Sequence, residues 1–100
     1  MDESIKAKFE ERARILKTLA HPTRLLIVDE LSRRERCVRE LTALVGDDIS
    51  TVSRHLAILK NAGIINFEKR GNEVHYILCC RCVTDFFSCA ENVINKNKRK

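Results

Sequence analysis

The sequence predicts a mainly α-helical domain that carries one β-hairpin. Apolar residues recur at the 3.6-residue spacing of helices up to residue 61 and again from residue 81. Between these regions, two runs rich in β-branched and aromatic residues flank Gly71-Asn72. A chain of 100 residues suffices for one small domain with a single core, so we expect one domain over residues 1–100.

Two helices are predicted in the first third of the chain. Over residues 3–19, apolar side chains fall on one helical face: Ile5, Phe9, Ala13 and Leu16. Pro22 then fits the first turn of a second helix, where its missing N–H costs nothing. This helix takes a broad apolar face from Leu25, Leu26, Val28 and Leu31. The charged segment "RRER" that follows is expected to be a connection.

The next two helices are short and closely spaced. "CVRELTALVG" predicts a helix that ends at Gly46 with a left-handed cap, and its inward residues are Val38, Leu41 and Leu44. Asp48 is a good N-cap for a following helix over residues 49–61. The predicted buried stripe of that helix consists of Ile49, Val52, Leu56 and Leu59.

The last part of the chain changes from helical to strand-like spacing and back. "IINFEKRGNEVHYIL" predicts a hairpin with one shared face, formed by Phe67, Val74, Tyr76 and Leu78. A final helix over about residues 81–96 would carry an apolar stripe of Val83, Phe86, Phe87, Ala90, Val93 and Ile94. The predicted order is α-α-α-α-β-β-α. Two helices joined by a tight turn and followed by a hairpin describe a winged helix-turn-helix.

The outer face of the 49–61 helix is suited to the major groove of DNA. At 100° per residue, the face opposite the buried stripe carries short or polar side chains, which let a helix backbone approach bases and phosphates. Arg54 is the best candidate for bidentate contact with guanine. The hairpin tip would contact the flanking backbone. The predicted DNA-binding residues are Ser50, Thr51, Ser53, Arg54, Asn61, Lys69, Arg70 and Asn72. The alternative is a helix face and a turn that are merely solvated.

Charge and composition narrow the class of protein only in part. The net charge is +5, but residues 81–100, with five basic and two acidic side chains, supply much of it. No stretch reaches the roughly 20 apolar residues of a membrane span, and the charged start does not resemble a secretory signal, so we expect a cytoplasmic protein. The sequence shows no Gly-rich phosphate loop, no Ser-His-Asp arrangement and no paired acids, so we expect no enzyme activity.

Four cysteines gather where the hairpin meets the last helix: Cys79, Cys80, Cys82 and Cys89. Five cysteines in a cytosolic chain are not a disulfide framework, and thiolates select soft, thiophilic ions. Cys82 and Cys89 lie about 10.5 Å apart along a straight helix, too far for one ion with bonds of about 2.3 Å. Cys89 therefore joins by distortion, meets thiols of a second chain, or is not a ligand. The alternative is that all four are small apolar packing residues.

The stretch "LVGDDISTVSRHLAILKNAGIINFEKRGNEVHYIL" resembles the DNA-binding core of the ArsR/SmtB repressors. The shared pattern is Leu-x-Gly, a capping residue, STVSxHL, a leucine-rich run, Ala-Gly-Ile and a wing ending in Tyr-x-Leu. "LKTLAHPTRLLIVDEL" resembles the upstream segment of the family, and the resemblance covers about residues 10–94. It implies a homodimer, formed through the first and last helices, that binds operator DNA. It also implies release when a metal, metalloid or oxidant binds.

The metal sites known in this family are only partly matched. Cys37 matches the first cysteine of an E-L-C-V-C-D-L site, but Arg39 replaces the second. Cys80 and Cys82 occupy the early positions of a zinc site between paired C-terminal helices, whereas Val93 and Lys96 occupy the late ones and are not ligands. His55 falls on the histidine of "SRHL", for which we expect a structural or backbone-contact role.

Trivalent arsenic or antimony is the inducer that the cysteines favour, because it takes three sulfurs in a pyramid and needs no histidine. We expect Cys79, Cys80, Cys82 and Cys89 to supply these sulfurs, and no permanent cofactor. Cadmium, lead or copper(I) is an alternative. A further alternative is a sensor of redox state or reactive sulfur, with a disulfide or persulfide at Cys37 or at Cys79/Cys80. The sequence leaves open the operator, the regulated genes, and the parts played by Cys37 and by a second chain's Cys89.

Overall fold

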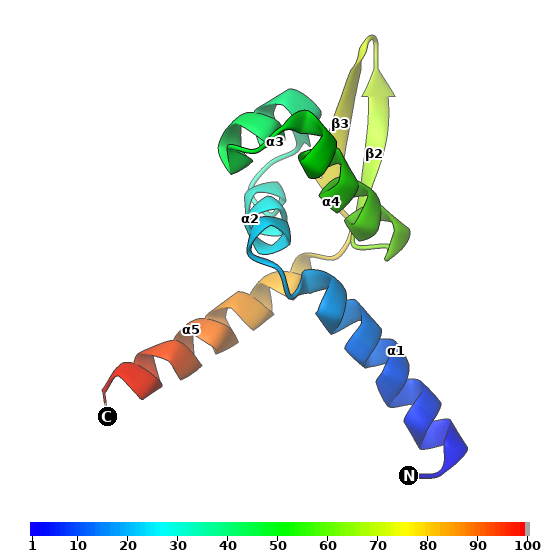
Figure 1. Ribbon diagram of the computed structural model, residues 1–100, viewed down its shortest axis with the longest axis vertical. Coiled ribbons are helices and arrows are strands. Elements are labelled where there is room, and N and C mark those ends of the chain that lie inside the picture. Colours follow the sequence, from blue (N-terminus) through cyan, green and yellow to red (C-terminus); the bar gives the residue numbers. More distant parts are fainter. Residues whose placement is uncertain (100) are drawn as a thin grey trace.

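The computed structural model describes residues 1–99, so the last residue of the expected 1–100 domain lies outside it. It confirms a mainly helical chain with a β-hairpin (Figure 1). The helices are α1 (Glu3–Leu19), α2 (Pro22–Leu31), α3 (Val38–Val45), α4 (Ile49–Asn61) and α5 (Thr84–Lys98). The strands are β1 (Arg36–Cys37), β2 (Ile65–Arg70) and β3 (Glu73–Leu78), and a single 3₁₀ turn, η1 (Arg81–Val83), precedes α5.

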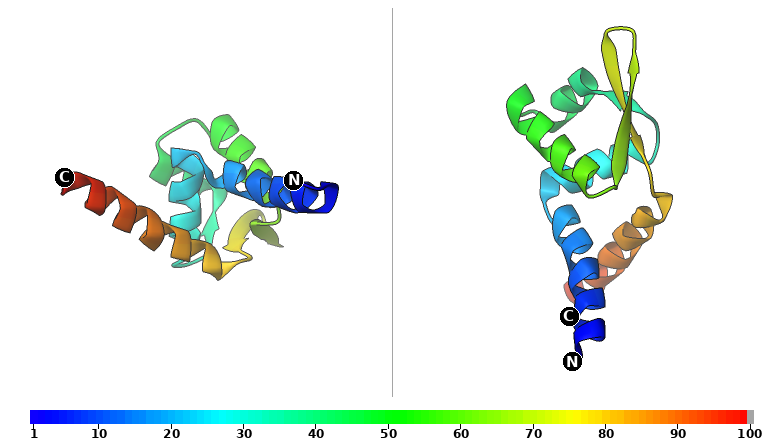
Figure 2. Two further views of the ribbon diagram at one scale, coloured as in Figure 1. Left: turned by 90° about the horizontal axis from the view of Figure 1, so that it is seen from below. Right: turned by 90° about the vertical axis from the view of Figure 1, so that its right-hand side faces the viewer.

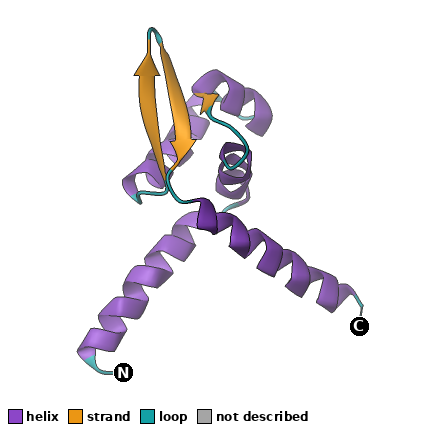
Figure 3. Cartoon of the chain, turned by 180° about the vertical axis from the view of Figure 1, so that it is seen from behind, coloured by secondary structure: helices purple, strands orange, loops and turns teal. Residues whose placement is uncertain are grey.

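The hairpin is part of a small antiparallel sheet with the strand order β1-β3-β2 (Figure 3). Strands β2 and β3 pair from Ile65 opposite Leu78 to Arg70 opposite Glu73. Strand β1 pairs with the other edge of β3, so that Cys37 lies opposite His75. The sequence predicts Arg36 in a charged connection and Cys37 at the start of the next helix, and this prediction is wrong for β1, because two residues are too few to show a strand period.

The core lies where α2, α3 and α4 meet the base of the hairpin. Its least exposed side chains are Ile27, Val28, Leu41, Val52, Leu56, Leu59 and Ile65. The tight turn between α3 and α4 uses Gly46, whose φ of 78° favours glycine. At the start of α4, the Asp48 carboxylate accepts a 2.7 Å hydrogen bond from the Thr51 backbone N–H. These local signals place α4 across α3 as a helix-turn-helix.

Two residues that the sequence analysis placed in the core are exposed. Leu44 and Ile49 expose 43% and 52% of their surface. Both prediction errors have the same cause. Leu44 lies near the last residue of α3 and Ile49 is the first residue of α4, and at such helix ends fewer residues of other elements cover a side chain than in the middle of a helix. Phe67 shares a face with Tyr76 as predicted, with ring centroids 5.8 Å apart, but it is also 41% exposed.

Helices α1 and α5 project from the body in diverging directions (Figure 1), and seen from the side they project toward the same end (Figure 2). Of the predicted α5 stripe, Val83 is buried and Phe87 is half-buried against the core. Leu19 at the end of α1 is buried as well, but most other large apolar side chains of the two helices are exposed, among them Ile5, Phe9, Leu16, Phe86, Val93 and Ile94. No helix within residues 1–99 is both long and apolar enough to cross a membrane.

Candidate functional site

The outward face of α4 carries polar side chains, most of them short. Ser50, Ser53, Arg54 and Asn61 are exposed, and Thr51 is half-buried at the capped first turn. The hydrogen bond from the Thr51 N–H lowers the pKa of Asp48, and the nearby Arg54 lowers this pKa further. Within residues 1–99 the Arg54 guanidinium forms no ion pair. It is therefore available to a base or a phosphate.

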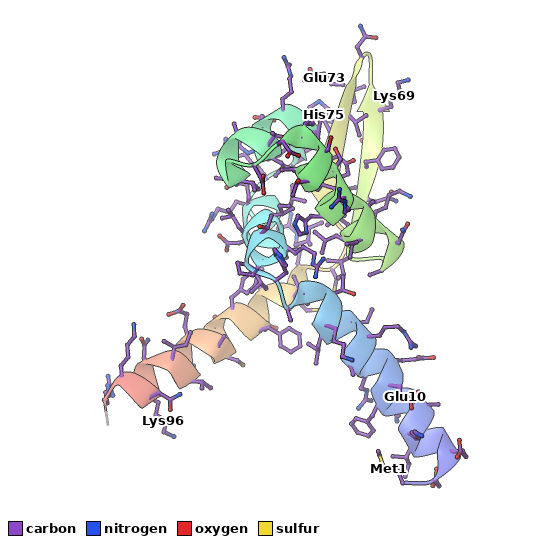
Figure 4. All side chains as sticks on the ribbon, viewed as in Figure 1. Met1, Glu10, Lys69, Glu73, His75 and Lys96 are labelled. Carbon is purple, nitrogen blue, oxygen red and sulfur yellow. The ribbon has the colours of Figure 1, made fainter. Side chains whose placement is uncertain are left out.

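The wing consists of β2, β3 and the turn between them. Gly71 has a φ of 63°, which lets the chain reverse direction at Gly71-Asn72. Lys69 is exposed near this turn, and Figure 4 shows its side chain directed outward from the wing. Lys69 has no ion-pair partner in the described part of the chain. Lys69 and Asn72 thus remain accessible at the end of the wing.

Arg70 differs from Lys69 because two carboxylates already hold its guanidinium. Its Nη1 and Nη2 donate to the two oxygens of Glu35 at 3.1 and 2.9 Å, and Nη2 also donates to Glu68 at 2.8 Å. The hydrogen bonds from Arg70 to Glu35 and Glu68 raise the pKa of Arg70. Sequence reasoning missed Glu35, because nothing in the local pattern pairs residues so far apart in the chain.

A second ion-pair network ties α2, β1 and α3 together. Arg36 donates to Glu30 at 3.1 and 2.9 Å and to Glu40 at 2.8 Å. Glu40 also accepts a 3.0 Å hydrogen bond from the Cys37 backbone N–H, which begins α3. That hydrogen bond, followed by the one from Arg36, lowers the pKa of Glu40 to about 2. On the other side of β1, Arg39 pairs with Glu73 of β3 at 3.4 Å.

His55 lies on the inner side of α4, against the start of α2. Its ring centroid is 4.5 Å from that of His21, whose Nδ1 accepts the N-capping hydrogen bond from the Thr23 N–H. The Nδ1 of His55 is buried with no hydrogen-bond partner among the described residues. Burial, followed by the nearby His21 and Arg24, lowers the pKa of His55, which favours the neutral imidazole. This environment agrees with the structural role expected for His55.

Only two of the four predicted metal-binding cysteines come together. The Sγ atoms of Cys80 and Cys82 are 2.7 Å apart, and both side chains are exposed. Cys79 and Cys89 are exposed as well. Cys79 donates its backbone N–H to Ile64 at 2.9 Å, and Cys89 lies in α5. Within residues 1–99 no group of three or more His, Cys, Asp or Glu side chains has the geometry of a metal site.

Cys82 lies in η1 and Cys80 is the N-cap of this turn, so the thiol pair lies between β3 and α5. The close contact between the two thiols raises the pKa of Cys82, and the nearby Asp85 raises this pKa further. The fifth cysteine, Cys37, is 5% exposed and opposite His75 in the sheet, so it is not part of this pair. The thiols found in contact within residues 1–99 are therefore those of Cys80 and Cys82, and a metal-binding cluster of four cysteines stays a prediction.

Comparison with known proteins agrees with the DNA-reading geometry. A family model described as "Bacterial regulatory protein, arsR family" matches residues 21–66, which span α2, α3, α4 and the start of β2. An uncharacterized HTH-type transcriptional regulator, Rv0081 of Mycobacterium tuberculosis, is 32% identical over 86% of this chain and 76% of its own length. The HTH-type transcriptional repressor SmtB of the same species is 44% identical over 64% of this chain, but over only 47% of its own length.

A solved structure extends the likeness to the whole fold. The homodimeric winged helix-turn-helix DNA-binding domain of Mb0332 from Mycobacterium bovis superposes with a TM-score of 0.79 at 27% identity. The match covers 97% of this chain and 90% of that domain, so it includes α1 and α5 as well as the wing. These similar proteins are transcriptional regulators rather than enzymes.

Proposed function

The chain belongs to the ArsR family of DNA-binding transcriptional repressors, and we propose that it represses its operator as a homodimer until an inducer binds the Cys80/Cys82 thiols. The family and the winged fold support the DNA-binding part of this proposal. The observation that carries the sensor part is the 2.7 Å approach of Cys80 Sγ to Cys82 Sγ at an exposed position. A DNA target also supports the proposal of a cytoplasmic protein.

DNA binding is assigned to the outward face of α4 and to the end of the wing. Arg54 is the proposed base-reading residue, because its exposed guanidinium has no ion pair in residues 1–99 and fits guanine bidentately. Lys69 is the proposed phosphate contact. The remaining proposed contacts are Ser50, Thr51, Ser53, Asn61 and Asn72. Arg70, engaged by Glu35 and Glu68, is better suited to hold the wing in position than to bind phosphate.

A second copy of the chain is the proposed cover for α1 and α5. Their exposed apolar side chains include Phe9 at 51%, Phe86 at 53% and Val93 at 59%, and burying them is favourable by about 25 cal/mol for each Å². The matching Mycobacterium bovis domain is homodimeric. Two α4 helices would then read half-sites about one helical turn apart, roughly 34–36 Å.

Trivalent arsenic or antimony remains the favoured inducer. Thiolates and thiols prefer such soft, thiophilic ions, and two sulfurs already lie side by side at Cys80 and Cys82. In the reaction with arsenous acid, each thiol proton leaves with an arsenic-bound hydroxide as water, and an As–S bond forms at each sulfur. Two such exchanges leave one hydroxide on arsenic. Cys79, next to Cys80, or a Cys89 of either chain would be the third thiol that displaces it.

Oxidation is the second candidate, because the same two sulfurs are close enough to join. A peroxide would take two electrons and both thiol protons from the pair, which leaves a Cys80–Cys82 disulfide and water. A low-molecular-weight persulfide would transfer its outer sulfur to either thiol: the S–S bond of the donor breaks, and the donor leaves as a thiol. Cadmium, lead and copper(I) are further ions that a dithiol binds.

Operator binding by fluorescence anisotropy, with reduced dimer, tests the proposal. Arsenite should raise the operator Kd of the wild-type protein by about 5- to 150-fold, the usual range of coupling between two sites. Cys80→Ser and Cys82→Ser should bind the operator normally and lose this response. Cys37→Ser is the matched control and should keep it.

The outcomes separate the candidates. A response to peroxide that dithiothreitol reverses, without saturable arsenite binding, would select the redox sensor. A Cys82→Ser protein that still responds to arsenite would disprove the Cys80/Cys82 site. A silent Cys37→Ser protein would move the sensor to the start of α3.

A further inference from the structure

Arg81, the one residue between the two thiols, reaches across to the end of α2. Its Nη1 donates a 3.2 Å hydrogen bond to the backbone carbonyl oxygen of Ser32. Cys80 and Cys82 flank it directly in the sequence. Val83 of η1 packs into the core, but the only side-chain hydrogen bond found between η1 and the helix-turn-helix body within residues 1–99 comes from Arg81, the residue that any bridge between these thiols would enclose.

The hydrogen bond from Arg81 to the Ser32 carbonyl oxygen acts on the C-terminal end of α2. Ser32 is the C-cap of α2, and the last carbonyls of a helix have no partner within the helix. An arginine at this end satisfies one of them and opposes the negative end of the helix dipole. The Ser32 hydroxyl donates to the Asp29 carbonyl, and its N–H donates to Val28, so the cap is held tightly to α2. A displacement of Arg81 would thus act on an ordered helix end.

From Ser32 the chain continues directly into both networks that hold the DNA-reading elements. Glu35 binds Arg70 of the wing at 2.9 and 3.1 Å. Arg36 binds Glu30 of α2 and Glu40 of α3, the helix that packs on α4. Arg81, Glu35 and Arg34 also line one hollow of about 410 Å³ with Leu31, Ile77 and Leu78. The segment 32–36 therefore contacts the thiol turn, the wing and α3 together.

We propose that Arg81 is a positioning residue that couples the state of the Cys80/Cys82 pair to the wing and the helix-turn-helix through Ser32. The proposal rests on the proposed thiol sensor. A bond between the two sulfurs, or an arsenic atom joining them, closes a small ring whose backbone includes Arg81. Ring closure changes the backbone angles of Arg81 and redirects its side chain. The Ser32 carbonyl then loses its donor, and the segment that positions Glu35 and Arg36 is released.

The test compares Arg81→Ala with Arg34→Ala, a matched control. Both arginines line the same hollow, but the Arg34 side chain forms no hydrogen bond or ion pair with residues 1–99. Both variants remove one positive charge from that hollow. Three quantities are measured for each protein: the operator Kd of the reduced dimer, the arsenite Kd, and the ratio of operator Kd with and without arsenite.

Arg81→Ala removes the donor permanently, so it should raise the operator Kd of the reduced dimer toward the arsenite-bound value and lower the ratio about fivefold, a usual size for a residue on a coupling route. Its arsenite Kd should stay within about twofold of wild type. Arg34→Ala should keep the wild-type ratio. Arg81→Lys, which retains a donor, should restore part of the response.

Three results would overturn the coupling role of Arg81. One is an unchanged ratio in Arg81→Ala when the wild-type protein responds, which leaves the proposed sensor intact. Another is an equal fall of the Kd ratio in Arg34→Ala, which would assign the effect to the loss of a positive charge. A third is an operator Kd of the reduced Arg81→Ala dimer equal to that of wild type, because the Ser32 carbonyl would then have lost its donor without any effect on DNA binding. A wild-type protein that responds to neither arsenite nor peroxide would overturn both this role and the proposed sensor.

Discussion

The Arg70 guanidinium on β2 lies against the Glu35 carboxylate, with hydrogen bonds of 3.1 and 2.9 Å between residues that are distant in the sequence. This contact fastens the wing to the loop between α2 and β1. Both side chains are partly exposed, at 49% and 41%, so water and salt screen the pair.

The Glu35–Arg70 contact should appear as a stabilising coupling in a double-mutant cycle. The free energy of unfolding in urea is measured for wild type, Glu35→Gln, Arg70→Gln and the double variant. The sum of the losses in the two single variants should exceed the loss in the double variant. The coupling should shrink as sodium chloride is raised, because both groups are solvent-accessible. Fully additive losses at low salt would contradict a direct ion pair.

Lys69 and Arg70 should have different effects on DNA binding although they are neighbours. Lys69→Ala should weaken binding to all sequences alike and reduce the slope of log Kd against log salt by about one, because one phosphate contact is lost. Arg70→Ala should change this slope less, since Glu35 and Glu68 already hold its charge. Equal slope changes in the two variants would show that Arg70 exchanges its carboxylates for phosphate.

Arg54 should determine sequence preference. Arg54→Ala should cost about 1–3 kcal/mol on the operator and little on random DNA, because a bidentate base contact is lost. Arg14→Ala, on the projecting α1 helix, removes the same charge and should leave the discrimination ratio unchanged. If Arg54→Ala still discriminates as wild type does, another residue of α4 reads the bases.

The exposed apolar residues of α5 should be needed for dimer formation. Phe86→Glu should produce monomers in sedimentation velocity, because a carboxylate would be buried in the dimer contact without a partner. Ile49→Glu is a matched control: Ile49 is exposed to the same degree, 52% against 53%, but lies in α4. A dimer that survives Phe86→Glu would place the contact elsewhere.

His55 should make the protein less stable as the pH falls. Its pKa is lowered in the folded chain, first by burial and then by His21 and Arg24, whereas the unfolded chain keeps the ordinary value of 6.5. The unfolded state therefore binds a proton first, so stability is complete above pH 6.5 and decreases as the pH falls from there toward the folded pKa. His55→Gln should remove this part of the pH dependence in urea unfolding between pH 7.5 and about 5. Parallel curves for the two proteins would exclude this role.

The sequence by itself determined the helices, their caps and the hairpin turn. Gly46, Asp48 and Gly71 act through backbone angles and hydrogen bonds to residues within three positions, so their effect is visible in the local pattern. The polar face of α4 was predictable for the same reason, since the helical period alone decides which side chains share a face.

Tertiary structure alone decided which of these residues meet. It gave Arg70 a carboxylate partner in Glu35, 35 positions away, and it directed Cys89 of α5 away from the thiol pair, whereas the contact between Cys80 and Cys82 is local. It also formed β1 and left Ile49 and Leu44 exposed at the helix ends. Periodicity reports the direction of a side chain on its own element. The partner that a side chain contacts depends on how elements far apart in the chain pack, and that packing is settled by the whole core rather than by neighbouring residues.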